Sequence, residues 1–511
     1  MEYYPWWNES QRKLADEAKA VTDELLIPLS EKSAWKKEFP WEALKEMARR
    51  GWFGALIPEK YGGRLEEWGV TGACILLEEI GRAGEINVPF ATTLIGGIHQ
   101  IIHDGTEEQK ERWLPGIAKG ELFGAITMTE PYAGSDVAGI ETTATRDVDV
   151  YVIDGRKRFQ SSSGAADIYM TYVKTSDSPE DVAKYRHLTA FVIEKGTPGF
   201  VVEQVNDLMG YDGIYNCYLS FNNARVPVDN RLGNEGNGWR VLTSGLNIER
   251  LCNATSALGA MRESIRYAVQ HLQRRVQFGA PTGEIATNQF KVADMLMRLN
   301  MARLLTYYTA YCADLGGEIP LESAVTKLFN SDSCLKTAIE AIQCMGGNGV
   351  TRSYPVERIM RDAKLNQIAA GTSEVLQLII YRQGLRNMMA DLKVPPRVMD
   401  DELEVPMPVG KLLPRRAVSG ENDVLEVLVE NYRINPGLHM TMEDIKELLD
   451  VSSKDLNGHL LSLEGKDLVS LYRDRRGDIA LARATYKGLD MAYPSEHYKH
   501  IPSWVNQKDI F

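Results

Sequence analysis

The sequence lacks the patterns that would place it among metal-binding or disulfide-bonded proteins. Its six cysteines are scattered singly, and no two of them form a CxxC pair. Neither a zinc site nor a disulfide framework is therefore indicated. Among the eight histidines, His99 and His103 have HxxxH spacing, but no carboxylate cluster adjoins them, and we expect no metal site. Single cysteines of this kind are typical of buried, reduced thiols in a cytoplasmic protein.

Targeting and membrane signals are also missing. The N-terminal residues lack the basic start and apolar run of a signal peptide. No stretch approaches the ~20 apolar residues that cross a bilayer. The net charge of −12 gives no general attraction to nucleic acid or anionic lipid. What remains is a chain of 511 residues, 44% hydrophobic and 25% charged, which is the composition of a large globular protein.

Helical periodicity occurs in two separate regions. Residues 1–124 contain segments such as Trp41 to Gly51 and Val70 to Ala83, in which apolar residues recur at three- and four-residue steps. The Thr106 segment is typical of a helix start. Residues 237–390 predict three long helices and a shorter fourth, at Gly238 to Gln277, Thr287 to Leu315, Glu322 to Met345 and after Thr372.

Residues 125–236 have a different pattern, of short apolar runs between Gly, Asn and Asp turns. The predicted strands are Tyr151 to Ile153, Ile168 to Val173, Leu188 to Glu194 and Cys217 to Phe221. The Asp154-Gly155 pair predicts a hairpin turn directly after the first of them. We therefore expect a mostly antiparallel β domain between the two helical regions.

The last part of the chain predicts a separate small domain. Residues 391–420 combine five prolines with mixed charge and predict a linker. Residues 421–511 then predict a helix over Asp423 to Tyr432, two helices opened by capping boxes at Thr441 and Ser452, and two strands around the turn RDRRGD. This order is that of a winged helix. The expected fold class is α+β multidomain: a helical domain, an antiparallel β domain, a helical bundle and a small winged-helix-like domain.

Five motifs resemble those of the acyl-CoA dehydrogenase family and occur in the family's order. They are IPEKYGG (57–63), AITMTEPYAGSDVAGIETTATRD (125–147), RRVQFGAP (274–281), GGNGVTRSYPVERIMRDAK (346–364) and AAGTSEVLQLIIYR (369–382). Together they span most of residues 1–390. The resemblance implies an FAD enzyme of fatty acid metabolism. In such an enzyme a carboxylate takes the α proton of an acyl-CoA, and flavin N5 accepts the β hydride.

The resemblance also points to Glu249 as the catalytic base. Many family members carry a glutamate at the position of Ala370, whose methyl group cannot accept a proton. A subset that includes isovaleryl-CoA dehydrogenase instead places the glutamate on a long helix, immediately before an arginine, as Glu249 and Arg250 stand here. The alternative for Glu249 is a solvated Glu–Arg pair on a helix surface. The backbone N–H of Ala370 would bind the thioester oxygen, and Ser135 and Arg250 would contact the substrate.

Further positions match FAD contacts of the family. Ser161 stands where the family usually has a threonine whose hydroxyl meets flavin N5. Phe159 replaces the tryptophan that commonly covers the flavin; its alternative is an ordinary aromatic of the β core. The positions that match FAD contacts within one subunit are Met128, Thr129, Gly134, Ser135, Phe159, Ser161, Thr372 and Glu374.

Four more residues resemble those that reach the FAD of a neighbouring subunit, namely Arg275, Phe278, Gln343 and Gly347. If they do so here, the resemblance implies a homodimer or a homotetramer. For Arg275 the alternative is a cation that caps the carboxyl end of a helix.

Three functions stay open from the sequence. The leading one is an acyl-CoA dehydrogenase that passes electrons to an electron-transfer flavoprotein and acts on a branched, cyclic or otherwise bulky acyl group. The second is a weakly active or non-catalytic relative that binds DNA in a damage response. Residues 421–511 argue against it, because their 16 acidic and 11 basic residues give a net charge of −5, and we expect a protein-interaction or oligomer-capping role for this domain. The third is an enoyl-CoA reductase, since the sequence does not set the direction of the reaction.

Overall fold

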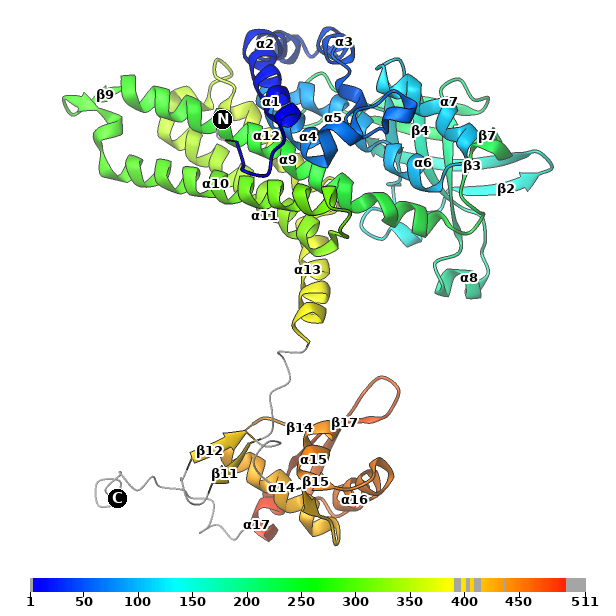
Figure 1. The fold of residues 1–511 in the computed structure, drawn as a ribbon, viewed down its shortest axis with the longest axis vertical. Helices are drawn as coiled ribbons and strands as arrows, with labels where there is room; N and C mark the ends of the chain where they lie inside the picture. The colour runs from blue at the N-terminus through cyan, green and yellow to red at the C-terminus, as the bar shows by residue number, and fades with distance from the viewer. Residues whose placement is uncertain (1–2, 390–396, 401–404, 409–414, 436, 493–511) are drawn as a thin grey trace. The chain divides into compact units, whose positions relative to one another are not determined.

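The computed structural model describes residues 3–389, 397–400, 405–408, 415–435 and 437–492. The chain divides into two compact units, Met1–Leu385 and Arg386–Phe511 (Figure 1). No helix in these ranges combines the length and the apolar character that crossing a bilayer requires.

The first unit begins with helices that pack around one large apolar core. Thr106 is the N-cap of the last of them and forms a capping box with Gln109, as the sequence predicted. The predicted helix at Val70 to Ala83 corresponds to α4, which starts earlier and ends at Ile80, where a 3-10 turn, Gly81–Ile86, follows. The helices, blue in Figure 1, are α1 (Glu9–Val21), α2 (Ile27–Lys36), α3 (Trp41–Arg49), α4 (Leu65–Ile80), α5 (Asn87–Ile95), α6 (Ile98–Asp104) and α7 (Glu107–Ala118).

An eight-stranded sheet follows, and it is mostly antiparallel as predicted. Its order is β6-β7-β3-β2-β4-β5-β8, and β1 pairs in parallel with β4. Buried aromatic and aliphatic side chains fill a second core on this domain. The strands are β1 (Gly124–Thr127), β2 (Thr143–Asp147), β3 (Val150–Gln160), β4 (Ile168–Lys174), β5 (Leu188–Glu194), β6 (Phe200–Val205), β7 (Cys217–Pro227) and β8 (Arg231–Leu232), with the short helix α8 (Pro179–Ala183) between β4 and β5.

The predicted hairpin turn at Asp154-Gly155 is wrong. β3 runs without interruption from Val150 to Gln160, and the turn of the hairpin lies between β2 and β3 instead. Gly155 has φ +147° and marks a register shift in the pairing of β3 with β7. A glycine in a strand interior commonly marks such a bulge. The Asp-Gly pair therefore does mark an irregular backbone position, but that position is a bulge in β3 and not the predicted hairpin turn.

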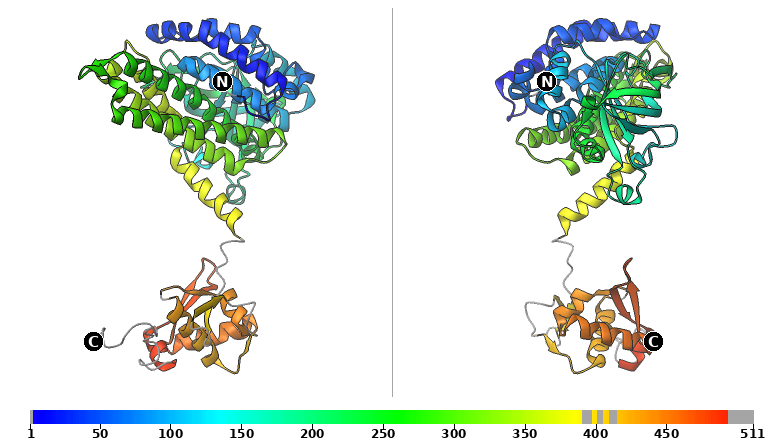
Figure 2. Two further views of the ribbon diagram at one scale, coloured as in Figure 1. Left: turned by 60° about the vertical axis from the view of Figure 1, so that its left-hand side comes forward. Right: turned by 90° about the vertical axis from the view of Figure 1, so that its right-hand side faces the viewer.

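The three longest helices of the first unit run beside one another, green in Figures 1 and 2, and α13 (Ser373–Met388) projects away from them. The first two are joined by a small hairpin of β9 (Val276–Gln277) and β10 (Ala280–Pro281). All four predicted helices are present, with boundaries within a few residues. They are α9 (Gly238–Arg274), α10 (Ala286–Asp314), α11 (Pro320–Met345) and α13 (Ser373–Met388), and α12 (Val356–Asn366) lies between the last two.

A buried charge network ties three of these helices together. Glu78 of α4 is fully buried, and its carboxylate lies 3.1 Å from Arg262 of α9 and 3.1 Å from Arg303 of α10. The hydroxyl of Tyr307, also on α10, donates to the same carboxylate at 2.7 Å. A buried carboxylate is stable only when it is paired in this way.

The second unit has its own core and the predicted order of elements. Its helices are α14 (Glu421–Ile434), α15 (Met442–Leu448), α16 (Ser453–Gly465) and α17 (Tyr486–Ala492). Thr441 and Ser452 are the N-caps of α15 and α16. A three-stranded sheet has the order β14-β17-β16 and consists of β14 (Met440–Thr441), β16 (Val469–Arg473) and β17 (Ile479–Ala484).

The stretch expected to be a linker, residues 391–420, contains paired strands. β11 (Arg397–Asp400) pairs with β12 (Val405–Pro408), and β13 (Arg416–Ala417) pairs in parallel with β15 (Leu449–Asp450). Proline at strand ends is compatible with edge pairing, so the prolines here did not exclude strands. The other residues of the stretch, apart from 415 and 418–420, lie outside the described ranges.

Candidate active site

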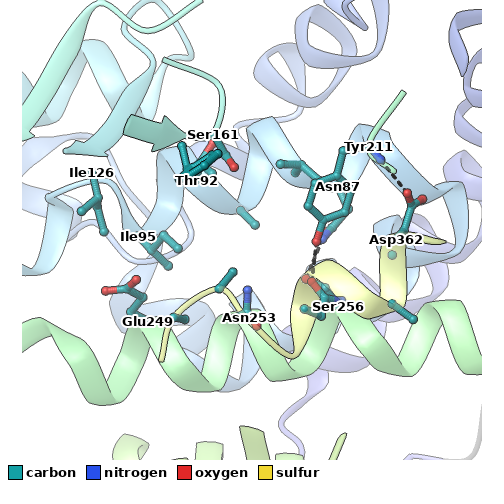
Figure 3. A pocket seen from close by; sticks show the side chains of 18 of the residues that line it. Asn87, Thr92, Ile95, Ile126, Ser161, Tyr211, Glu249, Asn253, Ser256 and Asp362 are labelled. Atoms are coloured by element: carbon teal, nitrogen blue, oxygen red, sulfur yellow. Dashed lines mark hydrogen bonds between the residues drawn. The ribbon is translucent and has the colours of Figure 1, made fainter. Parts of the chain in front are cut away.

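One cavity, of about 210 Å³, brings together residues from both helical regions and the sheet (Figure 3). Six of the residues singled out from the sequence line it: Met128, Thr129, Phe159, Ser161, Glu249 and Ala370. They come from the end of β1, the end of β3, helix α9 and the turn before α13. The motifs that are far apart in the sequence therefore meet at one site.

Glu249 lies on α9 with its carboxylate at one end of this cavity (Figure 3). Its side chain is buried, and Oε2 has no hydrogen-bond partner among the described residues. Burial raises the pKa of Glu249 to about 7, while the positive charges of Arg250 and Lys327 lower it in part. A carboxylate with a pKa near neutrality and a free oxygen is suited to accept a proton. The alternative of a solvated surface pair is therefore wrong.

Ala370 faces the same cavity from a strained turn. Its φ is +54°, in the left-handed region that alanine rarely adopts. Its backbone N–H donates to no acceptor within the described residues. The buried side chain of Lys327 fixes the turn, because its Nζ donates to the carbonyl of Gly371 at 2.7 Å. The sequence analysis missed Lys327, which has no motif signal of its own.

The turn that carries Met128 and Thr129 is held by a buried ion pair. Nζ of Lys157 lies 2.7 Å from Oε1 of Glu130, and it also donates to the carbonyl of Met128 at 3.1 Å. The backbone N–H of Thr142 donates to Glu130 at 3.1 Å. Because the pair joins β3 to the turn after β1, it fixes the position of the residues at the cavity wall. Glu130 lies inside a quoted motif, but neither it nor Lys157 was singled out.

Phe159 and Ser161 lie at the end of β3 and are held by one amide. Nδ2 of Asn216 donates to the carbonyl of Phe159 at 3.0 Å and to Oγ of Ser161 at 3.1 Å. Phe159 has φ +62° and its side chain is 49% exposed, so the alternative of a β-core aromatic is wrong. The guanidinium carbon of Arg158 lies 4.3 Å from the centre of the Phe159 ring.

The end of the cavity away from Glu249 is polar, which the sequence analysis did not anticipate. Nδ2 of Asn87 on α5 donates to Oγ of Ser256 on α9 at 2.5 Å. The carboxylate of Asp362 accepts from the backbone N–H of Tyr211 at 2.6 Å. Asn253 lies on the same wall, between Glu249 and Ser256 (Figure 3). Residues on one helix face are separated by three or four positions, so Asn253 and Ser256 could have been predicted from the position of Glu249.

The other residues that the sequence singled out do not line this cavity. Arg250 is buried beside Glu249, and its Nε has no partner within the described part of the chain. Thr372 accepts from the backbone N–H of Val375 at 3.3 Å at the start of α13. The others are exposed: Gly134, Ser135, Glu374, Arg275, Phe278, Gln343 and Gly347. Arg275 is the C-cap residue of α9. No group of three metal-ligating side chains occurs among the residues described.

Comparisons with known proteins find similarity along most of the first unit. Three family models match the chain, namely the N-terminal (residues 8–121), middle (125–224) and C-terminal (236–385) domains of acyl-CoA dehydrogenase. An acyl-CoA dehydrogenase of Bacillus subtilis is 38% identical over 70% of this chain and 93% of its own length. The mitochondrial isovaleryl-CoA dehydrogenase of Solanum tuberosum is 36% identical over 74% of this chain and 91% of its own length. The structure of butyryl-CoA dehydrogenase from Megasphaera elsdenii superimposes with a TM-score of 0.72 at 33% identity, covering 76% of this chain and all of that one.

Proposed function

Because this chain belongs to the acyl-CoA dehydrogenase family, we propose that it dehydrogenates the α,β bond of an acyl-CoA thioester with Glu249 as the base. Members of this family are FAD-dependent oxidoreductases that act on CH–CH groups. One observation carries the proposal. Glu249, which is buried and keeps one carboxylate oxygen unpartnered among the described residues, lines the same cavity as Ala370 and four of the matched flavin residues.

The residues of this cavity fit the chemistry of the family. FAD, when bound, supplies the acceptor for the hydride, and Met128, Thr129, Phe159 and Ser161 would hold its ring system at the cavity wall. A cavity lined mainly by apolar side chains with a few polar groups is usual for a cofactor site. The half-exposed ring of Phe159 would cover one face of the flavin.

Glu249 and Ala370 act on different atoms of the substrate. The ionised carboxylate of Glu249 takes the α proton. The free N–H of Ala370 donates to the thioester oxygen, where negative charge develops as the proton leaves. A donor of this kind is worth about 3–4 kcal/mol of transition-state stabilisation. Because Glu249 is buried, the electrostatic interactions of its carboxylate are stronger than they would be in solvent.

We further propose that the active enzyme is a homodimer or homotetramer. Phe278 is 99% exposed at the hairpin between α9 and α10, so its ring is available to a neighbouring subunit. Arg275, Gln343 and Gly347 are exposed as well and would reach the cofactor of a neighbouring subunit together with Phe278. Helix α10 adds further exposed apolar side chains: Phe290, Met297, Met301, Leu304 and Tyr308.

The finer assignments are proposals of the same kind. An electron-transfer flavoprotein is the acceptor, and a branched, cyclic or bulky acyl group is the substrate. Because position 370 holds alanine where many family members hold glutamate, there is more room near the α carbon, which supports such a substrate. All six cysteines are unpaired, which supports a reducing, cytoplasmic setting.

The second unit is proposed to be a winged-helix domain that binds protein rather than nucleic acid. Helix, strand, helix, helix and hairpin follow one another as in that motif. Lys454 is the one lysine or arginine within α16, the helix that would enter a DNA groove. Proteins that bind DNA rely on many such cations to neutralise phosphates.

Anaerobic titration of the purified holoenzyme with a panel of acyl-CoAs tests the function. We expect at least one saturated thioester to bleach the flavin spectrum. If only enoyl-CoAs react, and only with the reduced enzyme, the chain is a reductase. If no thioester reacts in either direction, the proposed function is wrong.

A further inference from the structure

One buried amide next to the active-site cavity has a partner for each of its polar atoms. Asn216 directly precedes β7 and is buried. Its Nδ2 donates to the carbonyl of Phe159 at 3.0 Å and to Oγ of Ser161 at 3.1 Å. Its Oδ1 accepts from Nδ2 of Asn206 at 2.9 Å. Phe159 and Ser161 line the cavity and Asn216 does not, so the amide can influence the cavity only through these two residues.

The carbonyl of Phe159 determines which way this amide points. A carbonyl oxygen can only accept a hydrogen bond, so the group of Asn216 that faces it must be the NH2 group. An NH2 group has two hydrogens, and the second one is directed to Ser161. Oγ of Ser161 is therefore the acceptor in this contact. The contact with Asn206 agrees with this orientation, because it brings a donor to the oxygen of the amide.

The hydrogen of the Ser161 hydroxyl is left for another acceptor. A serine hydroxyl has one hydrogen and two lone pairs, and the contact with Asn216 uses a lone pair. Within the described part of the chain, Oγ of Ser161 donates to no acceptor. Ser161 lies on the wall of the cavity (Figure 3). Its hydrogen is therefore available to a group in the cavity that accepts a hydrogen bond without donating one.

The backbone around Ser161 keeps its oxygen in place. Phe159 and Ser162 have φ of +62° and +59°, and residues other than glycine keep such conformations only where the surrounding structure holds them. Nε2 of Gln160 donates to the carbonyl of Thr129 at 2.9 Å, which ties this segment to the turn after β1. The fold thus sets where the oxygen of Ser161 lies, and Asn216 sets the direction in which its O–H points.

We propose that Asn216 is a positioning residue that keeps the Ser161 hydroxyl as a hydrogen-bond donor to N5 of the oxidised flavin. This inference rests on the proposed function, because it takes the FAD ring as the occupant of this wall. N5 of an oxidised flavin has a lone pair and no hydrogen, whereas N5 of a reduced flavin carries a hydrogen. A fixed donor therefore matches the oxidised form and faces a second donor in the reduced form. Asn216 should accordingly lower the reduction potential of bound FAD.

The test measures the reduction potential of bound FAD in the absence of substrate. Each holoenzyme is reduced anaerobically together with a reference dye, and the visible spectrum gives the ratio of reduced to oxidised flavin at a fixed dye potential. We expect Asn216→Leu and Ser161→Ala each to raise this ratio by about two- to tenfold, as the loss of one hydrogen bond predicts. The double variant should match Ser161→Ala alone, because Asn216 acts through that hydroxyl.

Asn206→Leu is the matched control. It removes the contact on the oxygen side of the same amide but keeps both N–H donors of Asn216. If Asn216 acts by directing the hydroxyl, the ratio in this variant should equal that of the unaltered enzyme. A role of Asn216 in local packing alone would shift the ratio in Asn206→Leu and Asn216→Leu alike.

The outcomes separate this inference from the function beneath it. Equal shifts in Asn206→Leu and Asn216→Leu, or additive shifts in the double variant, would refute the positioning role while the dehydrogenase stands. An unchanged ratio in Ser161→Ala would also refute it, even if no variant of Asn216 folds. Should Asn216→Leu not fold, Asn216→Ala takes its place in the same comparison. Purified protein without FAD would refute both proposals, and a flavin that shows the expected shifts but that no thioester reduces would refute only the proposed function.

Discussion

Two glutamates of the first unit are buried to almost the same degree and behave in opposite ways. Glu130 is 5% exposed and Glu249 is 7% exposed. Glu130 accepts from Lys157 and from two backbone N–H groups, and these partners lower its pKa despite burial. Glu249 has an oxygen without any partner in the described structure, and burial raises its pKa to about 7. Burial alone therefore does not decide the role of a carboxylate; its partners do.

Removing the carboxylate that has the raised pKa should have the largest effect. We expect Glu249→Gln to lower the rate of flavin reduction by about 10²–10⁴-fold, because the amide cannot take the α proton. Single-turnover stopped flow measures this directly. Glu263→Gln is the matched control, since Glu263 is buried on the same helix, pairs with Arg82 and Arg266 and does not line the cavity, and a comparable loss of chemistry in that variant would refute the assignment of the base.

Breaking the ion pair between Glu130 and Lys157 should lower the stability of the fold rather than the rate of the reaction. Lys157→Met leaves the carboxylate of Glu130 buried without its cation, which typically destabilises a protein by about 3–5 kcal/mol. Urea unfolding of the holoenzyme checks this. The double variant Lys157→Met/Glu130→Gln should recover part of the loss, because no buried charge is then left unpaired. Equal stabilities of the single and double variants would show that the pair does not hold the turn.

The raised pKa of Glu249 should also appear in the pH dependence of stability. In the folded state the carboxyl is still protonated at pH values where an unfolded glutamate, with a pKa near 4.5, has ionised. Its contribution is therefore fully present below pH 4.5 and is lost as the pH rises through about 7. At pH 8 we expect Glu249→Gln to be more stable than the unaltered enzyme, by up to ~3 kcal/mol. Unfolding curves at pH 5 and pH 8 that show no such difference would contradict the shift.

The smallest change concerns the cations that offset this burial. Lys327→Met removes one charge that lowers the pKa of Glu249, so the pKa should rise further. The rise of activity with pH should then move to higher pH, by roughly one unit or less. A pH–rate profile of flavin reduction measures the shift. Lys336→Met, on the exposed side of the same helix, should leave the profile in place, and a shift to lower pH in Lys327→Met would overturn the electrostatic account.

The sequence predicted the long elements well because their signals are local. The periodicity of α9, α10 and α11 and the caps at Thr106 and Thr441 each depend on a few neighbouring residues. The Asp154-Gly155 turn failed because a glycine signal marks an unusual backbone position, which here was a bulge in β3. β13 was missed because its pairing partner lies more than thirty residues along the chain, whereas the hairpin of β11 and β12 was missed because its prolines predicted a linker rather than strands.

The candidate site divides in the same way. Glu249 and Ala370 could be placed by motif, and the cavity brings them together. Lys327, Lys157 and Asn216 could not be found, because each acts through a contact with a residue many positions away. Asn253 is an intermediate case, since it lies one turn after Glu249 and needed only the direction of the helix face to be noticed.

The carboxylate of Glu78 has a consequence for how the first unit opens. It holds arginines from α9 and α10 at once, and α4 supplies the carboxylate itself. If any one of the three helices moved away, the carboxylate of Glu78 or a paired arginine would lose its partner inside the protein. Hydrogen exchange in their central turns therefore requires the three to separate together, and they form a single cooperative unit whose opening free energy is shared.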